Sequence, residues 1–129
     1  MSVELSYLAH VSVLTAIMWV PYILNLILVR GLIDAVGYPA DPKPLAPWAS
    51  RMKAAHANAV ENLVVFAPLV LVVEIAGFNN GTTALACTVY LWARVVHFGA
   101  YTFAIPWVRT VAFVTGFLCQ LTLALQILL

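Results

Sequence analysis

The sequence has 129 residues, of which 64% are hydrophobic and 9% are charged, and its formal net charge is +1. Soluble domains are roughly 45–50% apolar and about 25% charged, and a chain this small cannot hide so much apolar surface by folding in water. The composition therefore excludes an ordinary soluble domain and indicates an integral membrane protein. The near-neutral charge excludes a nucleic-acid-binding protein, which needs a clustered basic surface.

Four apolar segments follow one another along the chain, and each is long enough for the roughly 20 residues that a bilayer core requires. They lie at about 5–30, 48–76, 82–103 and 107–129. The connections between them contain proline, glycine and asparagine, which end helices and favour turns. The sequence therefore predicts an all-α fold, a single transmembrane domain over residues 1–129 built as a four-helix bundle that runs up and down.

The first segment lacks the features of a cleavable signal peptide. Glu4 precedes its apolar stretch, no lysine or arginine does, and no small-x-small cleavage site follows. We expect it to be retained as a membrane span, in which Pro21 predicts a kink and Asn25 a hydrogen bond to another helix. The proline-rich stretch at 37–47, a little beyond Arg30, predicts a loop.

The second segment opens with polar residues, in the stretch A-A-H-A-N-A-V-E-N at 54–62. Asn58, Glu61 and Asn62 are spaced i, i+3 and i+4, so they share one face of the predicted helix. His56 precedes Asn58 by two positions and points elsewhere. A charge within a span costs about 2.5 kcal/mol or more on insertion scales, so Glu61 is expected to be functional and to have a partner.

The third segment carries a second polar face. Tyr90, Arg94, His97 and Tyr101 are spaced i, i+4, i+7 and i+11, which forms one continuous stripe along a helix that is otherwise apolar. Arg109 follows at the start of the fourth segment. The sequence therefore places several hydrogen-bond donors along one helix and another just beyond its end.

Two interpretations of these polar faces are open. In the first, Glu61 only neutralises Arg94 across the helix interface. In the second, the two faces line a ligand pocket, because the stripe has more donors than one carboxylate can satisfy, and surplus arginines suit an anionic ligand that carries carboxylates. His56 and His97 have no neighbouring ligand set, so no metal is expected.

Basic residues gather on one side of the predicted bundle. They are Arg30, Lys43, Arg51, Lys53 and Arg109. By the positive-inside rule this side faces the cytoplasm and both termini lie on the opposite side. We expect a multi-pass protein of a bacterial inner membrane, or of an endoplasmic-reticulum-type membrane, whose site faces the cytoplasm.

Two motifs resemble those of the MAPEG family, the membrane-associated proteins in eicosanoid and glutathione metabolism. One is R-M-K-A-A-H-A-N-A-V-E-N-L-V-V-F-A-P at 51–68, and the other is A-R-V-V-H-F-G-A-Y-T-F-A-I-P-W-V-R at 93–109. Their order and the length of the chain also match the family, so the resemblance covers essentially the whole sequence.

The resemblance implies a homotrimer with active sites between neighbouring subunits and with glutathione as co-substrate. It implies that Arg109 lies close to the glutathione sulfur and that Tyr101 donates to the sulfur or positions the peptide. The glutathione-binding residues that it implies are Arg30, Arg51, Asn58, Glu61, Arg94, His97 and Tyr101. The implied reaction is detoxification: conjugation of a lipophilic electrophile from the bilayer, or reduction of a lipid hydroperoxide.

The chain departs from the family pattern in the second segment. Ala54 stands where several members carry arginine, and Arg51 or Lys53 are the nearby cations that would replace it. Two alternatives to the enzyme are open: a non-catalytic lipid-binding member of the family, and a small four-span exporter in which Glu61 would titrate during proton-coupled transport.

Overall fold

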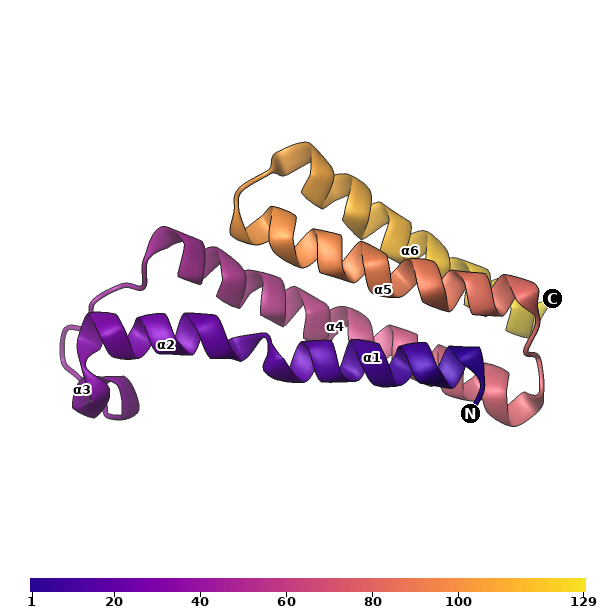
Figure 1. Ribbon diagram of the computed structural model, residues 1–129, viewed down its shortest axis with the longest axis horizontal. Coiled ribbons are helices and arrows are strands. Elements are labelled where there is room, and N and C mark those ends of the chain that lie inside the picture. The colour runs from indigo at the N-terminus through magenta and orange to yellow at the C-terminus, as the bar shows by residue number, and fades with distance from the viewer.

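The computed structural model describes residues 1–129, which form helices joined by short connections and no strand. The helices are α1 (Val3–Ile17), α2 (Trp19–Arg30), α3 (Leu32–Val36), α4 (Pro47–Ala76), α5 (Gly81–Thr102) and α6 (Pro106–Leu128). Both termini lie at one end of the molecule with the α4–α5 turn (Figure 1). The α2–α4 connection and the α5–α6 turn lie toward the other end. The all-α prediction is confirmed.

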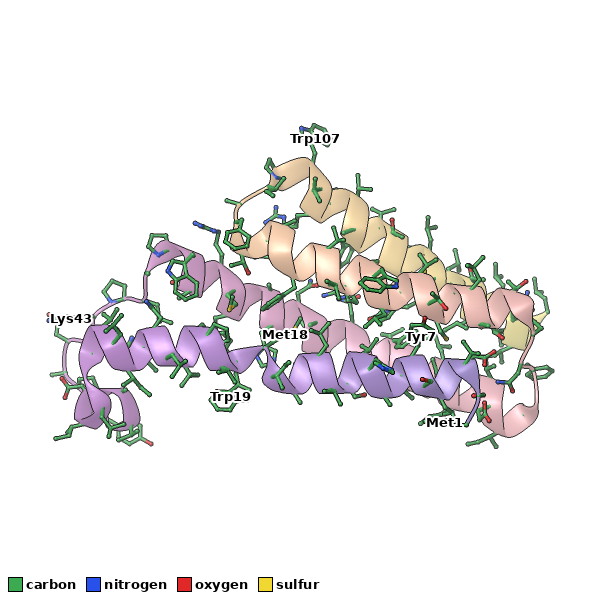
Figure 2. The ribbon with its side chains drawn as sticks, in the orientation of Figure 1. Met1, Tyr7, Met18, Trp19, Lys43 and Trp107 are labelled. Atoms are coloured by element: carbon green, nitrogen blue, oxygen red, sulfur yellow. The ribbon has the colours of Figure 1, made fainter.

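The first predicted segment is two helices rather than one, because α1 ends at Ile17 and α2 begins at Trp19. Proline has no N–H, and its ring collides with the carbonyl four residues earlier. For Pro21 that residue is Ile17, the last residue of α1, so the kink expected at Pro21 takes the form of a break. At the break Met18 is buried and Trp19 is exposed (Figure 2).

The short helix α3 was not predicted. Residues 37–46 are non-helical as expected, but Leu32–Val36 between Gly31 and Gly37 form a helical turn. Gly31 has φ 78°, a left-handed conformation that glycine adopts without a side-chain clash. This residue lets the chain leave α2 and start α3 immediately.

Helices α4 and α5 begin and end at the residues that their caps dictate. Pro47 is the first residue of α4, where its missing N–H costs nothing, and Gly77 closes the helix in the left-handed conformation. Asn80 caps α5 through its side chain, which accepts from the N–H groups of Thr82 and Thr83, in a capping box with the Thr83 hydroxyl.

Three segments are long and apolar enough to cross a membrane: Val3–Arg30, Pro47–Ala76 and Pro106–Leu128. Helix α5 covers the predicted third segment with 22 residues but is not among them. Its polar stripe, with Arg94 and His97, lowers its apolar character. The expectation of four apolar segments of membrane-spanning length is therefore confirmed for three of them.

The main hydrophobic core lies toward the end with the termini and joins α1, α4, α5 and α6. It consists of Val11, Phe66, Val70, Val73, Ala86, Cys87, Tyr90, Cys119 and Leu123. A smaller cluster of Tyr22, Ala49 and Met52 joins α2 to α4 toward the other end. At the end of the molecule opposite the termini, α2 packs mainly on α4 and α5 packs mainly on α6. These two pairs of helices therefore pack less closely against each other at that end.

Side-chain hydrogen bonds join the helices at the end of the molecule that holds the termini. The Thr83 hydroxyl donates to Glu4 Oε1 at 2.5 Å, which joins α5 to α1, and both side chains are buried. Ser2 Oγ and Asn79 Nδ2 both donate to Glu74 Oε2, at 2.7 and 2.8 Å. These carboxylates are satisfied by neutral donors, so this end needs no basic residue.

We expect Thr83→Val to lower the melting temperature in detergent micelles. The substitution leaves the buried Glu4 carboxylate without its hydroxyl donor and also removes half of the capping box, and a buried polar group that loses its partner costs about 1–3 kcal/mol. The control is Thr82→Val, because Thr82 is adjacent on α5 and exposed. Equal melting temperatures for the two variants would show that the Thr83–Glu4 hydrogen bond contributes nothing to stability.

Candidate ligand-binding site

Arg94 occupies the interior of the helical protein without a carboxylate partner. Its side chain is 2% exposed, its Nη2 donates to Asn58 Oδ1 on α4 at 2.7 Å, and its Nε has no hydrogen-bond partner. A guanidinium in a low-dielectric interior needs every acceptor it can reach. The Arg94–Asn58 hydrogen bond therefore joins the two predicted polar faces, as their spacing on α4 and α5 suggested.

This hydrogen bond also determines which way Asn58 faces. Arginine carries only donors, so the amide atom that meets Arg94 must be the oxygen of Asn58, and the NH₂ group of Asn58 points away from it. Asn62 Nδ2 donates to the Asn58 carbonyl at 2.8 Å and to Asn58 Oδ1 at 3.2 Å. Gln120 Nε2 on α6 donates to the Asn62 carbonyl at 3.1 Å. Three helices are thus linked through one amide network.

The stripe of α5 continues through aromatic contacts. His97 is buried, and its ring meets Tyr101 edge to face with centroids 5.7 Å apart. The Arg109 guanidinium lies over the Tyr101 ring, 4.8 Å from its centroid. A cation over an aromatic face is attracted by the ring quadrupole, so Tyr101 holds the charge of Arg109 beside the end of α5.

A cavity of about 180 Å³ opens beside Tyr101 and Arg109, between the first turns of α4 and α6 and the last turn of α5. It is lined by Arg51, Ala100, Tyr101, Ala104, Ile105, Pro106 and Arg109. Arg51 Nε donates to the Thr102 carbonyl at 2.8 Å, which fixes the guanidinium beside the cavity. Two cations therefore face a partly apolar hollow.

The α5–α6 turn that lines the cavity is strained. Ala104 has φ 58°, and it is the only residue other than glycine with a positive φ. This left-handed conformation costs an L-residue with a side chain roughly 1–2 kcal/mol. The strain is concentrated between Tyr101 and Arg109, where it sets the distance between the end of α5 and the first turn of α6.

Glu61 and Arg30 do not join this cavity within one protomer. Glu61 is exposed on α4, whereas Arg94 is buried and bonded to Asn58, so the interpretation of an internal Glu61–Arg94 ion pair does not hold. Arg30 Nε donates to the Lys43 carbonyl at 2.7 Å, in the α2–α4 connection. Of the predicted binding residues, Arg51 and Tyr101 line the cavity, Asn58, Arg94 and His97 lie outside its lining, and Glu61 and Arg30 hydrogen-bond none of the others.

Two polar contacts near the site were not predicted from the sequence. The Tyr22 hydroxyl hydrogen-bonds His56 Nδ1 at 2.6 Å and joins α2 to α4. Gln120 completes the amide network from α6. An amide isolated in a long apolar segment is itself a signal, because polar side chains in spans bond across helices. The sequence alone did not say which helix Gln120 would reach.

Together these features define an all-helical protein with membrane-length apolar helices and an arginine-lined polar site at one end. The chain belongs to the MAPEG family, whose family model matches residues 8–129. The resemblance found in the sequence is thereby confirmed over nearly the whole chain. Membership and the three long apolar helices together point to a multi-pass membrane protein. No curated protein matches the chain.

We expect Asn58→Leu to destabilise the protein by about 1.5–3 kcal/mol, because it leaves the buried Arg94 guanidinium without its acceptor. Asn58→Asp should retain most of the stability, since a carboxylate still accepts from Arg94. Thermal unfolding followed by circular dichroism in detergent measures both variants. If Asn58→Leu were as stable as the unmodified protein, another group would have to satisfy Arg94.

Proposed function

We propose that this protein is a membrane-bound glutathione-dependent transferase or peroxidase. The observation that carries the proposal is the cavity in which Arg51 and Arg109 converge beside Tyr101. Membership in the MAPEG family supports it, because microsomal glutathione transferases belong to that family. Neither arginine of the cavity is neutralised by a carboxylate in the protomer, so the cavity has positive charge to offer to an anion.

The charges around the cavity complement those of glutathione. The tripeptide carries two carboxylates, one ammonium group and a thiol. Arg51 lines the cavity and supplies a guanidinium group for a carboxylate, whereas the buried Arg94 is proposed to act through the NH₂ group of Asn58, which it turns away from itself. Glu61 is the one acidic residue among these polar faces, and it matches the single ammonium group.

Arg109 is the proposed activator of the thiol. A free thiol has a pKa near 8.5, and the thiolate is the nucleophile, so a cation beside the sulfur raises the reactive fraction at neutral pH. Arg109 lies in the first turn of α6, after Pro106, where backbone N–H groups add to the local positive field. Tyr101 lies under Arg109 and is the proposed hydroxyl donor to the sulfur or to the peptide.

The site of one protomer is incomplete, which supports a site between subunits, as in the homotrimer that the family resemblance implies. Ligand pockets usually have volumes of about 300–1,000 Å³, whereas the cavity in the protomer has about 180 Å³. Glu61 is an exposed carboxylate on a helix that is long and apolar enough to span a bilayer, and facing lipid would be costly. A neighbouring subunit would cover Glu61, bring its own Arg30, and make α5 a fourth span shielded from lipid.

The second substrate is proposed to be lipophilic and to come from the bilayer. The cavity is lined by Ala100, Ala104, Ile105 and Pro106 as well as by the arginines, so it has both a polar and an apolar side. The thiolate would displace a leaving group from an electrophile. Alternatively it would attack the terminal oxygen of a lipid hydroperoxide, which breaks the O–O bond and releases the lipid alcohol, and a second glutathione would convert the resulting sulfenic acid to glutathione disulfide and water. The cluster of basic residues supports an orientation with this end in the cytoplasm and both termini opposite, as in a bacterial inner membrane.

We expect Arg109→Ala to lower kcat at least about tenfold for glutathione conjugation to an aryl halide at neutral pH, since one unit of thiol pKa corresponds to tenfold in thiolate. Part of the rate should return above pH 8.5, where thiolate forms without the arginine. Lys43→Ala is the control, because Lys43 does not line the cavity and its only hydrogen bond is made by its backbone carbonyl. Undiminished turnover in Arg109→Ala would remove Arg109 from the mechanism.

We expect Glu61→Gln to weaken glutathione binding about tenfold in calorimetry, because the amide cannot accept the ammonium group with a full charge. Binding of an analogue without the ammonium group should be unaffected by the substitution. Equal loss for both ligands would assign Glu61 to the architecture instead. Failure of the unmodified protein to bind glutathione at all would favour the lipid-binding alternative.

A further inference from the structure

The connection between α2 and α4 displays apolar side chains that nothing in the protomer covers. Leu32, Ile33 and Val36 of α3 and the adjacent Tyr38 are all exposed, and Ile33 is 84% exposed. The main packing partner of α3 is α2. A run of exposed aliphatic and aromatic side chains in a short connection marks an interaction surface.

The remaining side of this segment is polar. Arg30, Asp34, Asp41 and Lys43, with Pro39 and Pro42, line a small cavity of about 70 Å³. The Arg30 hydrogen bond to the Lys43 carbonyl closes the connection around it. The segment is therefore amphipathic, with apolar residues on the outside and two cations and two carboxylates gathered on the inner side.

The apolar side of α3 continues the outer surface of α2. Leu24 and Leu28 are exposed on α2, Leu28 by 82%, and the exposed Leu32 opens α3 directly after Gly31. In Figure 1, α3 lies below the last turns of α2, on the side away from α4. The outer surface of α2 belongs to a segment that is long and apolar enough to cross a bilayer, so α3 stands where that surface reaches the edge of the hydrocarbon.

We propose that α3 and Tyr38 form an interfacial membrane contact in which Leu32, Ile33 and Val36 insert at the boundary between headgroups and acyl chains. Tyrosine prefers this depth because its ring is apolar and its hydroxyl is polar. The inner side, with Asp34, remains toward water. This contact fixes how deeply the α2 end sits, and with it the level of the α2–α4 connection at the membrane surface.

The charges of the segment identify the lipid property that it recognises. Arg30 and Lys43 are balanced by Asp34 and Asp41, so attachment depends on apolar insertion rather than on attraction to anionic headgroups. The contact should therefore form equally in zwitterionic and in anionic bilayers. A second copy of the chain covering the same face would instead exclude both water and lipid from it.

The experiment places a nitroxide spin label at Ile33→Cys and, as a matched control on the same helix, at Asp34→Cys. The full-length protein is reconstituted in phosphatidylcholine nanodiscs, with and without phosphatidylglycerol. Collisions with oxygen, which concentrates in lipid, are compared with collisions with a water-soluble nickel chelate. The native Cys87 and Cys119 are buried, so the unmodified protein gives the labelling background.

We expect the Ile33 label to favour oxygen and the Asp34 label to favour the nickel chelate, with a severalfold difference in the ratio and no change with phosphatidylglycerol. Preference of the Ile33 label for the nickel chelate would overturn the proposal in favour of a solvated loop. Low collision rates with both reagents would overturn it in favour of a contact between subunits. No glutathione is present, so the outcome is independent of the proposed enzymatic activity.

Discussion

The structure depends on the hydrogen bond that one buried guanidinium, that of Arg94, makes inside an apolar helical protein. Arg94 is buried on α5 and has an asparagine rather than a carboxylate as its partner. Because lipid offers no hydrogen bonds, the protein itself must supply every acceptor for such a group. Asn58 supplies one such acceptor, to Nη2, while Nε of Arg94 has none, and the amide network from Asn58 through Asn62 to Gln120 links α4, α5 and α6 around it.

The two ends of the molecule differ in how their charged side chains are satisfied and in how closely their helices pack. At the end with the termini, Glu4 and Glu74 are satisfied by hydroxyl and amide donors, and the main core packs four helices together. At the other end α2 pairs with α4 and α5 pairs with α6, and the cations Arg51 and Arg109 meet at a hollow. Stability is thus concentrated away from the end that has unneutralised charge to offer a ligand.

Much of the candidate site could be read from spacing along the chain. Tyr90, Arg94, His97 and Tyr101 fall on one face of a helix because the helical period requires it, and the two polar stripes suggested that this face meets that of the second segment. Which side chains meet across helices depends on rotation and depth of packing. Spacing therefore suggested Glu61 as the partner of Arg94, whereas in the folded protomer Asn58 occupies that place and Glu61 faces outward.

The sequence by itself determined the all-helical class, the membrane character, the MAPEG resemblance and the end of the molecule at which cations gather. These follow from composition, periodicity and motif order, which can be read from the sequence without knowledge of tertiary contacts. Only the tertiary structure decided that Pro21 breaks the first segment at Met18, that α3 exists, and that Ala104 takes a left-handed conformation between Tyr101 and Arg109. Proline and glycine are local signals for a bend or a turn, but whether the chain kinks, breaks or starts a new helix there also depends on how the flanking helices pack on their neighbours.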